Sequence, residues 1–304
     1  MRALRFHSYG DPADVLRLDE TDKPEPGDGQ IRIAVEACGL TPADWAICGG
    51  LHDGVLPRGI GLEVSGTVDA LGAGVTGVEV GDPVLGPSVY AGASGGAADF
   101  ALMATWFPRP AGLGAVQAAA LPMAVETAYR GIDALGDVSG RRVLVSGAGT
   151  TIGLAAAQIA LRLGARVIAS SGDTFAGLLR EAGAEVVAYG EGLGPRVTAL
   201  AGGPVDLVFD AAPAGIMAEL LTTVTDPTHI VTATDFAAIR DFGVRSTGMN
   251  MRYDVLGEYA ELAARGRLVM PIAGTYPLDR WREPLAVSRS GKARGKHVLV
   301  PAPH

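Results

Sequence analysis

The stretch VLVSGAGTTIG, residues 143–153, decides how this chain of 304 residues folds. A β-branched run, RRVLVSG, leads into it, the helical sequence IGLAAAQIALRLG continues from it, and a second β-branched run, ARVIASS, comes next. A strand, a glycine-rich turn, a helix and a second strand within about 30 residues form the βαβ unit that binds dinucleotides. The sequence therefore predicts a nucleotide-binding turn between a strand and a helix.

The residues of this turn have separate expected roles. Gly147 permits the tight turn, Gly149 lets the backbone approach a ligand closely, and Gly153 lets the helix pack near the strand. The start of the helix offers unpaired N–H groups and a positive dipole end to a pyrophosphate. The hydroxyls of Thr150 and Thr151 either donate to phosphate oxygens or cap the helix. The expected pyrophosphate-binding residues are Gly147, Gly149, Thr150, Thr151, Ile152 and Gly153.

The end of the second strand selects the cofactor. An acid at this point usually bonds the ribose hydroxyls of NAD and would repel a 2′-phosphate. Here the strand ends in Ser170-Ser171-Gly172, and Asp173 lies two positions beyond the expected point. Small hydroxyls suit a 2′-phosphate better than an acid does, so the sequence favours NADP(H). Asp173 and the absence of a nearby lysine limit that preference.

The composition is that of a globular protein with a negative net charge. Hydrophobic residues make up 48% and charged residues 19% of the chain, and the formal net charge is -8. This charge argues against nucleic acid or an anionic membrane as a partner. No apolar run reaches the roughly 20 residues of a membrane helix, and the first residues lack an apolar signal core, so we expect a cytoplasmic protein. Cys38 and Cys48 are too few for a four-cysteine zinc lobe or a disulfide framework.

The order of the predicted elements indicates two domains in an α/β fold. IRIAVEACGL and GLEVSGTVDALGAGVTGVEVGDPVLG read as short strands separated by Gly and Asp turns, which is typical of a compact antiparallel barrel. From about residue 115, apolar strands alternate with helices, which predicts a parallel sheet with helices on both faces. The tail from LVMPIAGTYPL to HVLV returns to short strands, so we expect it to rejoin the first domain.

Nearly the whole chain resembles the medium-chain dehydrogenase/reductase superfamily, and it looks like the zinc-independent quinone oxidoreductase (zeta-crystallin-like) branch. The resemblance is carried by GLEVSGTVDALGAGVTGVEVGDPVLG, SGAGTTIGLAAAQIA, VDLVFDAA and GKARGKHVLV. It implies a GroES-like β-barrel substrate domain of residues 1–118 and 256–304. It also implies a Rossmann domain with a doubly wound parallel sheet, residues 119–255, and NADP(H) bound in the cleft between the domains. A homodimer joined through the cofactor domains is a further implication.

The resemblance also implies roles for single residues of the cofactor site. Thr127 would approach the carboxamide of the nicotinamide. Ser171 and Tyr189 would lie near the adenosine 2′-phosphate, where relatives often add a lysine. That lysine position corresponds to Ala176 here. Tyr189 could equally be an ordinary aromatic residue at a strand end.

Zinc is not expected in this chain. In the metal-dependent branch the first ligand is a cysteine near the position of Thr41, the second is a histidine at Leu62, and the third lies near Pro122. None of these three side chains binds zinc as those ligands do. Without a Lewis acid to polarise an alcohol oxygen, we expect a reductase without a metal.

The segment TPADWAIC, residues 41–48, departs from the pattern of relatives, which often read Asn-Pro-x-Asp-x-(Tyr or Lys)-x-Arg. Asp44 is kept. Thr41 replaces the asparagine, Ala46 the tyrosine or lysine, and Cys48 the arginine. The substrate of a relative therefore cannot be transferred to this chain.

Protonation of the product needs a donor, and the candidate is His52, in a segment where several relatives have a tyrosine. A histidine that titrates near neutrality could bond the carbonyl and protonate the product. The alternative is a surface histidine beside Asp53, with water, or Thr41 relaying from water, as the donor. The expected catalytic residues are His52, Thr41 and Asp44.

The predicted function is an NADPH-dependent oxidoreductase of a small molecule. Hydride would go to a C=C or C=O conjugated with a carbonyl, as in a quinone or an α,β-unsaturated ketone or thioester. One alternative is a pathway-specific enoyl reductase of a biosynthetic intermediate, which the altered segment 41–48 favours. Another is a nucleotide-binding sensor or structural protein that has lost turnover, because fold alone does not establish a reaction.

Overall fold

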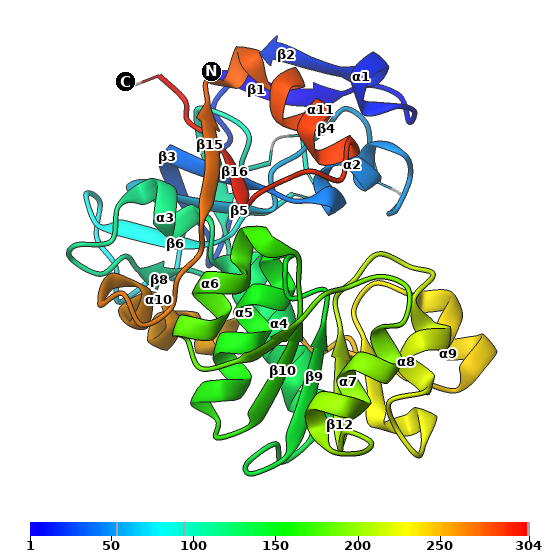
Figure 1. The fold of residues 1–304 in the computed structure, drawn as a ribbon. Helices are drawn as coiled ribbons and strands as arrows, with labels where there is room; N and C mark the ends of the chain where they lie inside the picture. Colours follow the sequence, from blue (N-terminus) through cyan, green and yellow to red (C-terminus); the bar gives the residue numbers. More distant parts are fainter. Residues whose placement is uncertain (53, 91, 94, 303–304) are drawn as a thin grey trace. The chain divides into compact units, whose positions relative to one another are not determined.

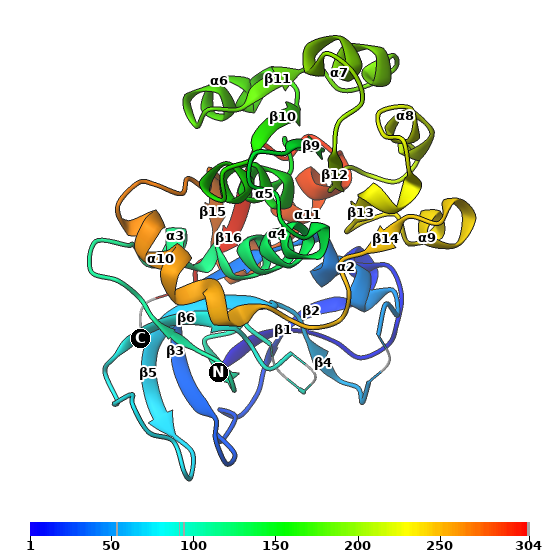
Figure 2. The same ribbon diagram turned by 90° about the horizontal axis from the view of Figure 1, so that it is seen from below.

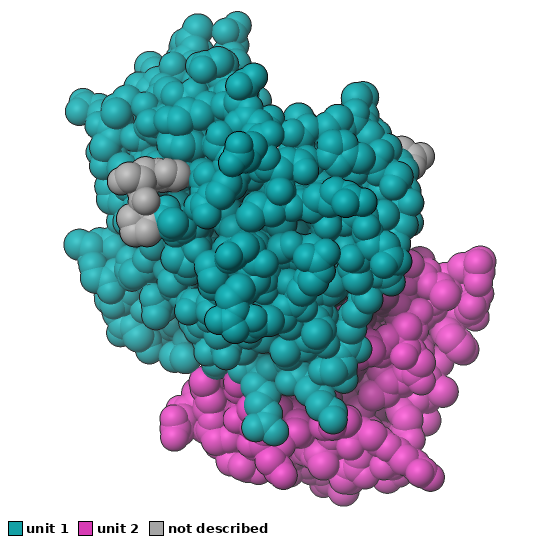
Figure 3. Space-filling view, turned by 90° about the horizontal axis from the view of Figure 1, so that it is seen from above, with its two compact units in different colours: residues 1–123, 256–304 teal, residues 124–255 magenta. Residues whose placement is uncertain are grey.

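The computed structural model describes residues 1–52, 54–90, 92–93 and 95–302, which form two compact units. Unit 1 contains Met1–Met123 and Leu256–His304, and unit 2 contains Ala124–Val255 (Figure 3). Unit 2 is therefore inserted into the chain of unit 1. The sequence placed the first boundary at 118–119, five residues earlier than the structure does. The difference arises because Ala119 packs in a small apolar cluster of unit 1.

Unit 1 consists of two sheets and short helices. A three-stranded sheet has the order β2-β1-β4, and a larger sheet has the order β15-β16-β3-β5-β6-β8, with β7 paired to β3. The strands are β1 (Arg2–Phe6), β2 (Leu16–Glu20), β3 (Ile31–Leu40), β4 (Arg58–Gly59), β5 (Glu63–Leu71), β6 (Pro83–Pro87), β7 (Phe100–Met103), β8 (Phe107–Pro108), β15 (Ile272–Tyr276) and β16 (Lys296–Leu299). The helices are α1 (Pro12–Val15), α2 (Pro42–Cys48), α3 (Ala115–Ala119), α10 (Leu256–Ala264), η3 (Leu278–Arg280) and α11 (Arg282–Arg289).

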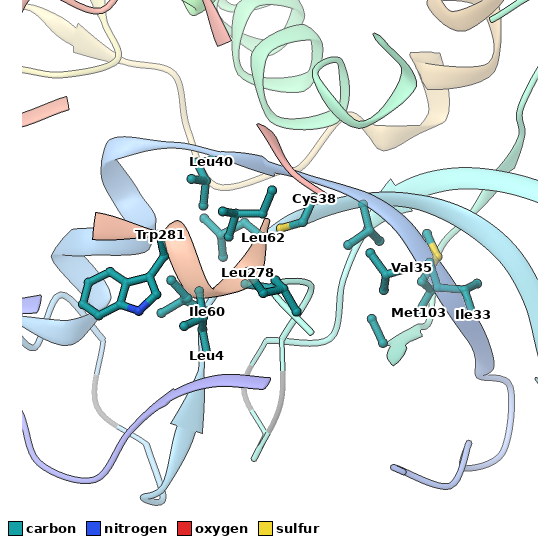
Figure 4. Packing of buried hydrophobic residues seen from close by; sticks show 14 of the residues in the cluster. Leu4, Ile33, Val35, Cys38, Leu40, Ile60, Leu62, Met103, Leu278 and Trp281 are labelled. Atoms are coloured by element: carbon teal, nitrogen blue, oxygen red, sulfur yellow. The ribbon is translucent and has the colours of Figure 1, made fainter. Parts of the chain in front are cut away.

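The core of unit 1 follows from the alternation of its strands. In β3 the side chains of Ile31, Ile33 and Val35 are buried and their neighbours are half-buried, as the two-residue period of a strand requires. These residues belong to the same apolar cluster as Leu278 and Trp281 from the last part of the chain, and in the view of Figure 4 Leu278 lies between Trp281 and Val35. The C-terminal segment is thus part of the first domain's core, as its strand pattern predicts.

Unit 2 is a six-stranded sheet in which every pair of neighbours is parallel. Its order, β11-β10-β9-β12-β13-β14, is the 3-2-1-4-5-6 order of a dinucleotide-binding doubly wound fold (Figures 1 and 2). The strands are β9 (Arg142–Ser146), β10 (Arg166–Ser170), β11 (Glu185–Val187), β12 (Leu207–Asp210), β13 (Ile230–Thr232) and β14 (Arg245–Ser246). The helices are α4 (Pro122–Leu135), α5 (Thr151–Arg162), α6 (Asp173–Glu181), α7 (Leu193–Ala201), α8 (Met217–Leu221), η1 (Pro227–His229), α9 (Phe236–Phe242) and η2 (Tyr253–Val255).

Helices cover both faces of this sheet. Apolar side chains of α7, α8 and α9 pack on one face against β9, β10, β12 and β13. In Figure 2 the helices α4 and α5 lie on the opposite side of the sheet from α7 and α8. The near-continuous burial of β9 and β10 is what a parallel sheet covered on both faces requires. Among the residues that the structure describes, no helix is long and apolar enough to span a membrane.

Candidate functional site

The turn after β9 has the geometry that its glycines predict. Gly147 has φ of +70°, in the left-handed region. A Cβ atom at this position would lie 2.5 Å from the amide nitrogen of Ala212, so only glycine fits between β9 and the chain that follows β12. The amide of Gly147 donates to Oγ of Ser170 at 3.1 Å, and the amide of Ala148 donates to the carbonyl of Ser170 at 2.9 Å. The end of β10 therefore holds the turn in place.

Gly153 and Gly149 differ sharply in the space around them. A Cβ on Gly153 would lie 2.1 Å from the carbonyl oxygen of Gly147, so α5 reaches the turn only through a glycine. A Cβ on Gly149 would meet one atom within 4 Å, Oγ of Ser171 at 3.3 Å. The space over Gly149 is therefore open, and no contact within the fold requires a glycine at this position. A phosphate group that approaches the backbone fits this open position.

The start of α5 leaves donors free beside that position. Thr150 is the N-cap, and its Oγ1 accepts from the amide of Gly153 at 3.0 Å. In the described part of the chain, the amides of Gly149, Thr151 and Ile152 have no hydrogen-bond acceptor. Of the two roles considered for the threonines, the structure shows the capping role for Thr150. The half-buried Thr151 remains as a hydroxyl donor.

This turn lies where the strand order of the sheet reverses. β9 pairs with β10 on one side and with β12 on the other, and α5 and α7 leave on opposite faces. Ligands of doubly wound sheets bind at the carboxyl ends of the strands beside such a switch point. The residues at hand therefore fit a dinucleotide, with its pyrophosphate at the start of α5.

The two serines at the end of β10 have different surroundings. Ser170 is buried, and its Oγ accepts from the amide of Gly147, so it supports the turn and has no surface for a ribose phosphate. Ser171 is also buried, at 4% exposure; its hydroxyl donates to the carbonyl of Gly172 at 3.0 Å, and its Oγ lies 3.3 Å from the place of a Cβ on Gly149. Of the two serines predicted to bind the cofactor, Ser171 is therefore the one that lies next to the open space over Gly149.

The chain after β11 contributes an exposed aromatic ring to the same edge. Tyr189 is 67% exposed, and its ring lies 3.0 Å from the place of a Cβ on Gly172. The guanidinium of Arg196 donates to the carbonyls of Ala188 at 3.0 Å and of Glu191 at 2.8 Å. Arg196 therefore fixes the segment that carries Tyr189.

Cations for a 2′-phosphate are scarce in unit 2. Residues 124–255 contain no lysine. Ala176, at the position that corresponds to the lysine of relatives, is a buried residue of α6. Arg196 is already bonded to backbone carbonyls. The groups beside the open space over Gly149 are thus a hydroxyl and an aromatic ring, with no lysine.

In unit 1 the structure brings Thr41 and Asp44 together. Asp44 is 0% exposed. Its Oδ2 accepts from the amide of Thr41 at 2.7 Å and from the Thr41 hydroxyl at 2.9 Å. Its Oδ1 accepts from the amides of Gly61 at 2.8 Å and Leu62 at 3.1 Å. Burial raises the pKa of Asp44, and the hydrogen bonds from Thr41 and Gly61 oppose that shift. The carboxylate holds the start of α2 against the start of β5 and has no surface for a substrate.

His52 lies at the other end of α2. The seven-residue helix lies between Thr41, which is its N-cap, and His52, which comes four residues after Cys48. Its imidazole is exposed and has no hydrogen bond to another described residue. Its carbonyl accepts from Nη1 of the buried Arg58 at 2.5 Å, so the backbone is fixed and the ring is free. Asp53, the neighbour considered from the sequence, lies outside the described residues.

The positions that would ligate zinc carry no ligand set. The Thr41 hydroxyl is bonded to Asp44, Leu62 is a buried apolar side chain, and Pro122 begins α4. Within the described ranges, no group of three or more His, Cys, Asp or Glu residues is placed to hold a metal ion. The residues present do not fit a catalytic zinc.

Two ion pairs that each contain a buried glutamate were not predicted from the sequence. Glu63 and Lys296 are both buried and form an ion pair, and Oε2 of Glu63 also accepts from the amide of Met123 at 2.8 Å. Burial raises the pKa of Glu63, and the charge of Lys296 opposes the shift. The second pair is Glu126 with Arg130 on α4. Both glutamates stand in apolar runs, GLEVSG and MAVETAY, which is the signal that could have identified them.

Sequence comparisons place both units among dehydrogenases and reductases. Residues 27–122 match the family "Alcohol dehydrogenase GroES-like domain", and residues 182–299 match "Zinc-binding dehydrogenase". Quinone oxidoreductase from Homo sapiens is 36% identical over 178 residues, which are 57% of this chain and only 53% of that protein. A 2-methylene-furan-3-one reductase from Solanum lycopersicum is 28% identical over 322 residues, covering 100% of this chain and 80% of that protein.

Solved structures extend the likeness over the whole chain. The quinone oxidoreductase from Coxiella burnetii is 26% identical and superposes with a TM-score of 0.86, covering 99% of each chain. A mycobacterial protein solved in complex with NADPH is 27% identical with a TM-score of 0.84, covering 99% of this chain and 100% of that one.

Proposed function

Because the chain belongs to the medium-chain dehydrogenase/reductase superfamily, in its quinone oxidoreductase branch, we propose that it is an NADPH-dependent oxidoreductase. Its acceptor would be a C=C or C=O conjugated with a carbonyl, in a quinone or an α,β-unsaturated ketone or thioester. The observation that carries the proposal is the glycine turn of β9, with open space over Gly149 at the switch point of the sheet. NADPH, when bound, supplies the hydride.

The chain's own residues would bind and orient the cofactor. The free amides of Gly149, Thr151 and Ile152 suit the pyrophosphate, and the hydroxyl of Thr151 adds a donor. Ser171 and the ring of Tyr189 flank the adenosine end. These hydroxyls support a preference for NADPH over NADH, and the lack of lysine in unit 2 keeps the expected preference small.

Cofactor choice is tested by titrating the purified protein with NADPH and NADH and following nicotinamide fluorescence. Tighter binding of NADPH supports the proposal. Equal affinities, or tighter binding of NADH, would show that Asp173 or another group controls the ribose site.

On the substrate side we propose His52 as the proton donor. The hydrogen of the Thr41 hydroxyl is directed to Asp44, so Thr41 presents its oxygen as an acceptor. His52 has an exposed ring on a fixed backbone, and an imidazole can donate to an enolate-like oxygen near neutral pH. Asp44 acts as a positioning residue in this scheme, because it touches Thr41 and not a substrate.

We further propose that the reaction needs no zinc. The argument is the chemistry of Thr41, Leu62 and Pro122, none of which is a metal ligand at these positions. Elemental analysis of the purified protein is expected to find no stoichiometric zinc, and chelators are expected to leave turnover unchanged. About one zinc per chain would overturn this assignment.

A homodimer through unit 2 remains a proposal, supported by an open sheet edge. β14 is the last strand of the sheet and has β13 as its neighbour. Large apolar side chains are exposed around it, with Phe236 at 68% and Met249 at 90%. Unpaired edges with apolar neighbours favour association with a second copy. Light scattering that finds a monomer at working concentration would refute it.

A second candidate is a dedicated enoyl reductase of a biosynthetic intermediate. The name of the tomato relative, 2-methylene-furan-3-one reductase, supports enone reduction within this group of proteins. The substitutions at residues 41–48 support a substrate that differs from those of relatives.

A cytoplasmic location stays a prediction from the sequence.

One experiment separates the candidates. NADPH oxidation is followed with quinones, simple enones and enoyl thioesters at matched concentrations. Turnover of quinones and enones supports the main proposal, and turnover confined to one enoyl class supports the dedicated reductase. Tight NADPH binding without turnover of any acceptor would instead favour a sensor that has lost its reaction.

A further inference from the structure

The buried carboxylate of Glu126 has bonds that an ordinary ion pair does not need. Glu126 is 0% exposed and lies one turn before Arg130 on α4. Nε of Arg130 donates to Oε1 of Glu126 at 2.6 Å, and Nη2 donates to Oε2 at 3.2 Å. An apolar pair of the same size often stabilises a fold as well as a buried ion pair does. The other groups that form hydrogen bonds with Glu126 and Arg130 therefore indicate what the pair does.

The first of these partners is the irregular segment between β14 and η2, residues 247–252. Nη1 of Arg130 donates to Oγ1 of Thr247 and to the carbonyl of Gly248, each at 2.6 Å. The amide of Arg252 donates to Oε1 of Glu126 at 3.0 Å. Both ends of this segment are thus bonded to one ion pair.

The second partner is the hydroxyl of Thr127. Oγ1 of Thr127 donates to Oε2 of Glu126 at 3.2 Å. A hydroxyl has one hydrogen, so this bond leaves the oxygen of Thr127 as an acceptor. The carboxamide of a nicotinamide presents an NH₂ group, which requires an acceptor. A carboxylate beside Thr127 therefore selects the orientation in which that amide group faces α4.

We propose that Glu126 is a positioning residue for the nicotinamide end of the cofactor site. Through one buried carboxylate it turns the Thr127 hydroxyl into an acceptor and fixes the backbone of residues 247–252. The part that concerns the nicotinamide rests on the proposed function. The anchoring of residues 247–252 does not.

The first variant is Glu126→Gln. Glutamine offers one acceptor oxygen where the carboxylate meets four donors, from Arg130 (two), Arg252 and Thr127. Its NH₂ group would donate to the oxygen of Thr127 and reverse that hydroxyl. The second variant, Glu126→Leu with Arg130→Met, replaces the pair by apolar side chains and leaves no buried charge unpaired. Asp206→Asn is the control, because it breaks the Arg142–Asp206 pair elsewhere in unit 2.

The readout is binding of NADPH compared with binding of 2′,5′-ADP, which lacks the nicotinamide. We expect Glu126→Gln to weaken NADPH about threefold to tenfold, the worth of one hydrogen bond, and 2′,5′-ADP less than about twofold. Thr127→Val should weaken NADPH binding by a similar factor. The double variant Glu126→Gln with Thr127→Val should bind NADPH only slightly more weakly than either single variant. Asp206→Asn should leave both ligands unchanged.

Hydrogen exchange tests the anchoring independently of any cofactor. Exchange of the Arg252 amide and its neighbours in residues 247–252 should accelerate in both Glu126 variants and stay unchanged in Asp206→Asn. Equal weakening of NADPH and 2′,5′-ADP would mean that Glu126 only stabilises the fold, and the inference fails. Additive effects of Glu126→Gln and Thr127→Val would also overturn it. If the parent protein binds no NADPH, the proposed function fails, and the exchange result still decides whether Glu126 anchors the segment.

Discussion

Replacing Gly149 and Gly153 by alanine, one at a time, separates the fold of the turn from its ligand. At Gly153 the new methyl would lie 2.1 Å from the carbonyl oxygen of Gly147, and an ordinary contact begins at 3.4 Å. The start of α5 would have to move by about 1.3 Å. Overpacking of this kind costs about 1–3 kcal/mol, so Gly153→Ala should lower Tm by roughly 3 °C or more.

Gly149→Ala should behave in the opposite way. Its methyl would meet only Oγ of Ser171, at 3.3 Å, and no strained φ is involved. Alanine also restricts the unfolded chain, which stabilises by about 0.4–1 kcal/mol. The Tm should therefore stay level or rise slightly. If a pyrophosphate approaches this backbone, the methyl removes one or two amide–phosphate bonds, and the Kd for NADPH should rise roughly tenfold to a hundredfold.

The assay pairs thermal unfolding of each ligand-free variant with fluorescence titration of NADPH. The reasoning is refuted in its first half if Gly153→Ala is as stable as the parent. Its second half is refuted if the Kd of Gly149→Ala for NADPH lies within about twofold of the Kd of the parent, because the loss of one hydrogen bond cannot be detected below that factor. A loss of stability in Gly149→Ala would show that the space over this residue is filled by protein.

Three further predictions concern unit 1. Asp44→Ala leaves the amides of Thr41 and Gly61 without an acceptor. Urea unfolding should therefore show a free energy of unfolding that is about 3–5 kcal/mol lower than that of the parent. A decrease of less than about 1 kcal/mol would contradict the assigned role. Burial, and to a lesser extent the charge of Lys296, lower the pKa of His297 below its usual 6.5. The unfolded chain therefore binds more protons just below that pH, so the urea midpoint of the parent should fall on acidification, and it should fall less in His297→Gln. An equal fall in both proteins would show that His297 does not cause this pH dependence. His52→Ala should reduce turnover at least about tenfold with NADPH affinity unchanged, whereas parent-like turnover would leave protonation to water or to Thr41.

Local constraints made the cofactor turn predictable. Gly147 and Gly153 are required by contacts within the βαβ unit itself, so their spacing in the sequence was sufficient evidence. Ser170 was read as a ribose contact because it ends β10, and nothing in the sequence shows that its hydroxyl faces Gly147 across the sheet. The missing information was the pairing of neighbouring strands.

Longer-range contacts explain the other differences. Asp44 was expected among the catalytic residues, but besides Thr41 its carboxylate accepts from the amides of Gly61 and Leu62, which lie 17 and 18 residues away and reach it only in the folded unit. The spacing of Glu126 and Arg130 was visible as an ion-pair pattern on a helix. Surface pairs of this kind are common, and only the folded unit shows that Glu126 is buried.

The charges buried in unit 1 bear on how an enolate could be stabilised. The charge of Asp44 raises the pKa of Glu63, and Lys296 is the cation that acts on both carboxyls. If both carboxyls were ionised, this group of three would carry one net negative charge beside Thr41. Burial is the main cause that raises the pKa of both acids, and the charge of Lys296 opposes the rise. An ionised Asp44, with Oδ2 2.9 Å from the Thr41 hydroxyl, disfavours a developing oxyanion at Thr41, so Thr41 is a poor place for the substrate oxygen to gain charge. Stabilisation must then come from a donor outside this group, which is the physical reason for placing His52, and not Asp44 or Thr41, at the reacting oxygen.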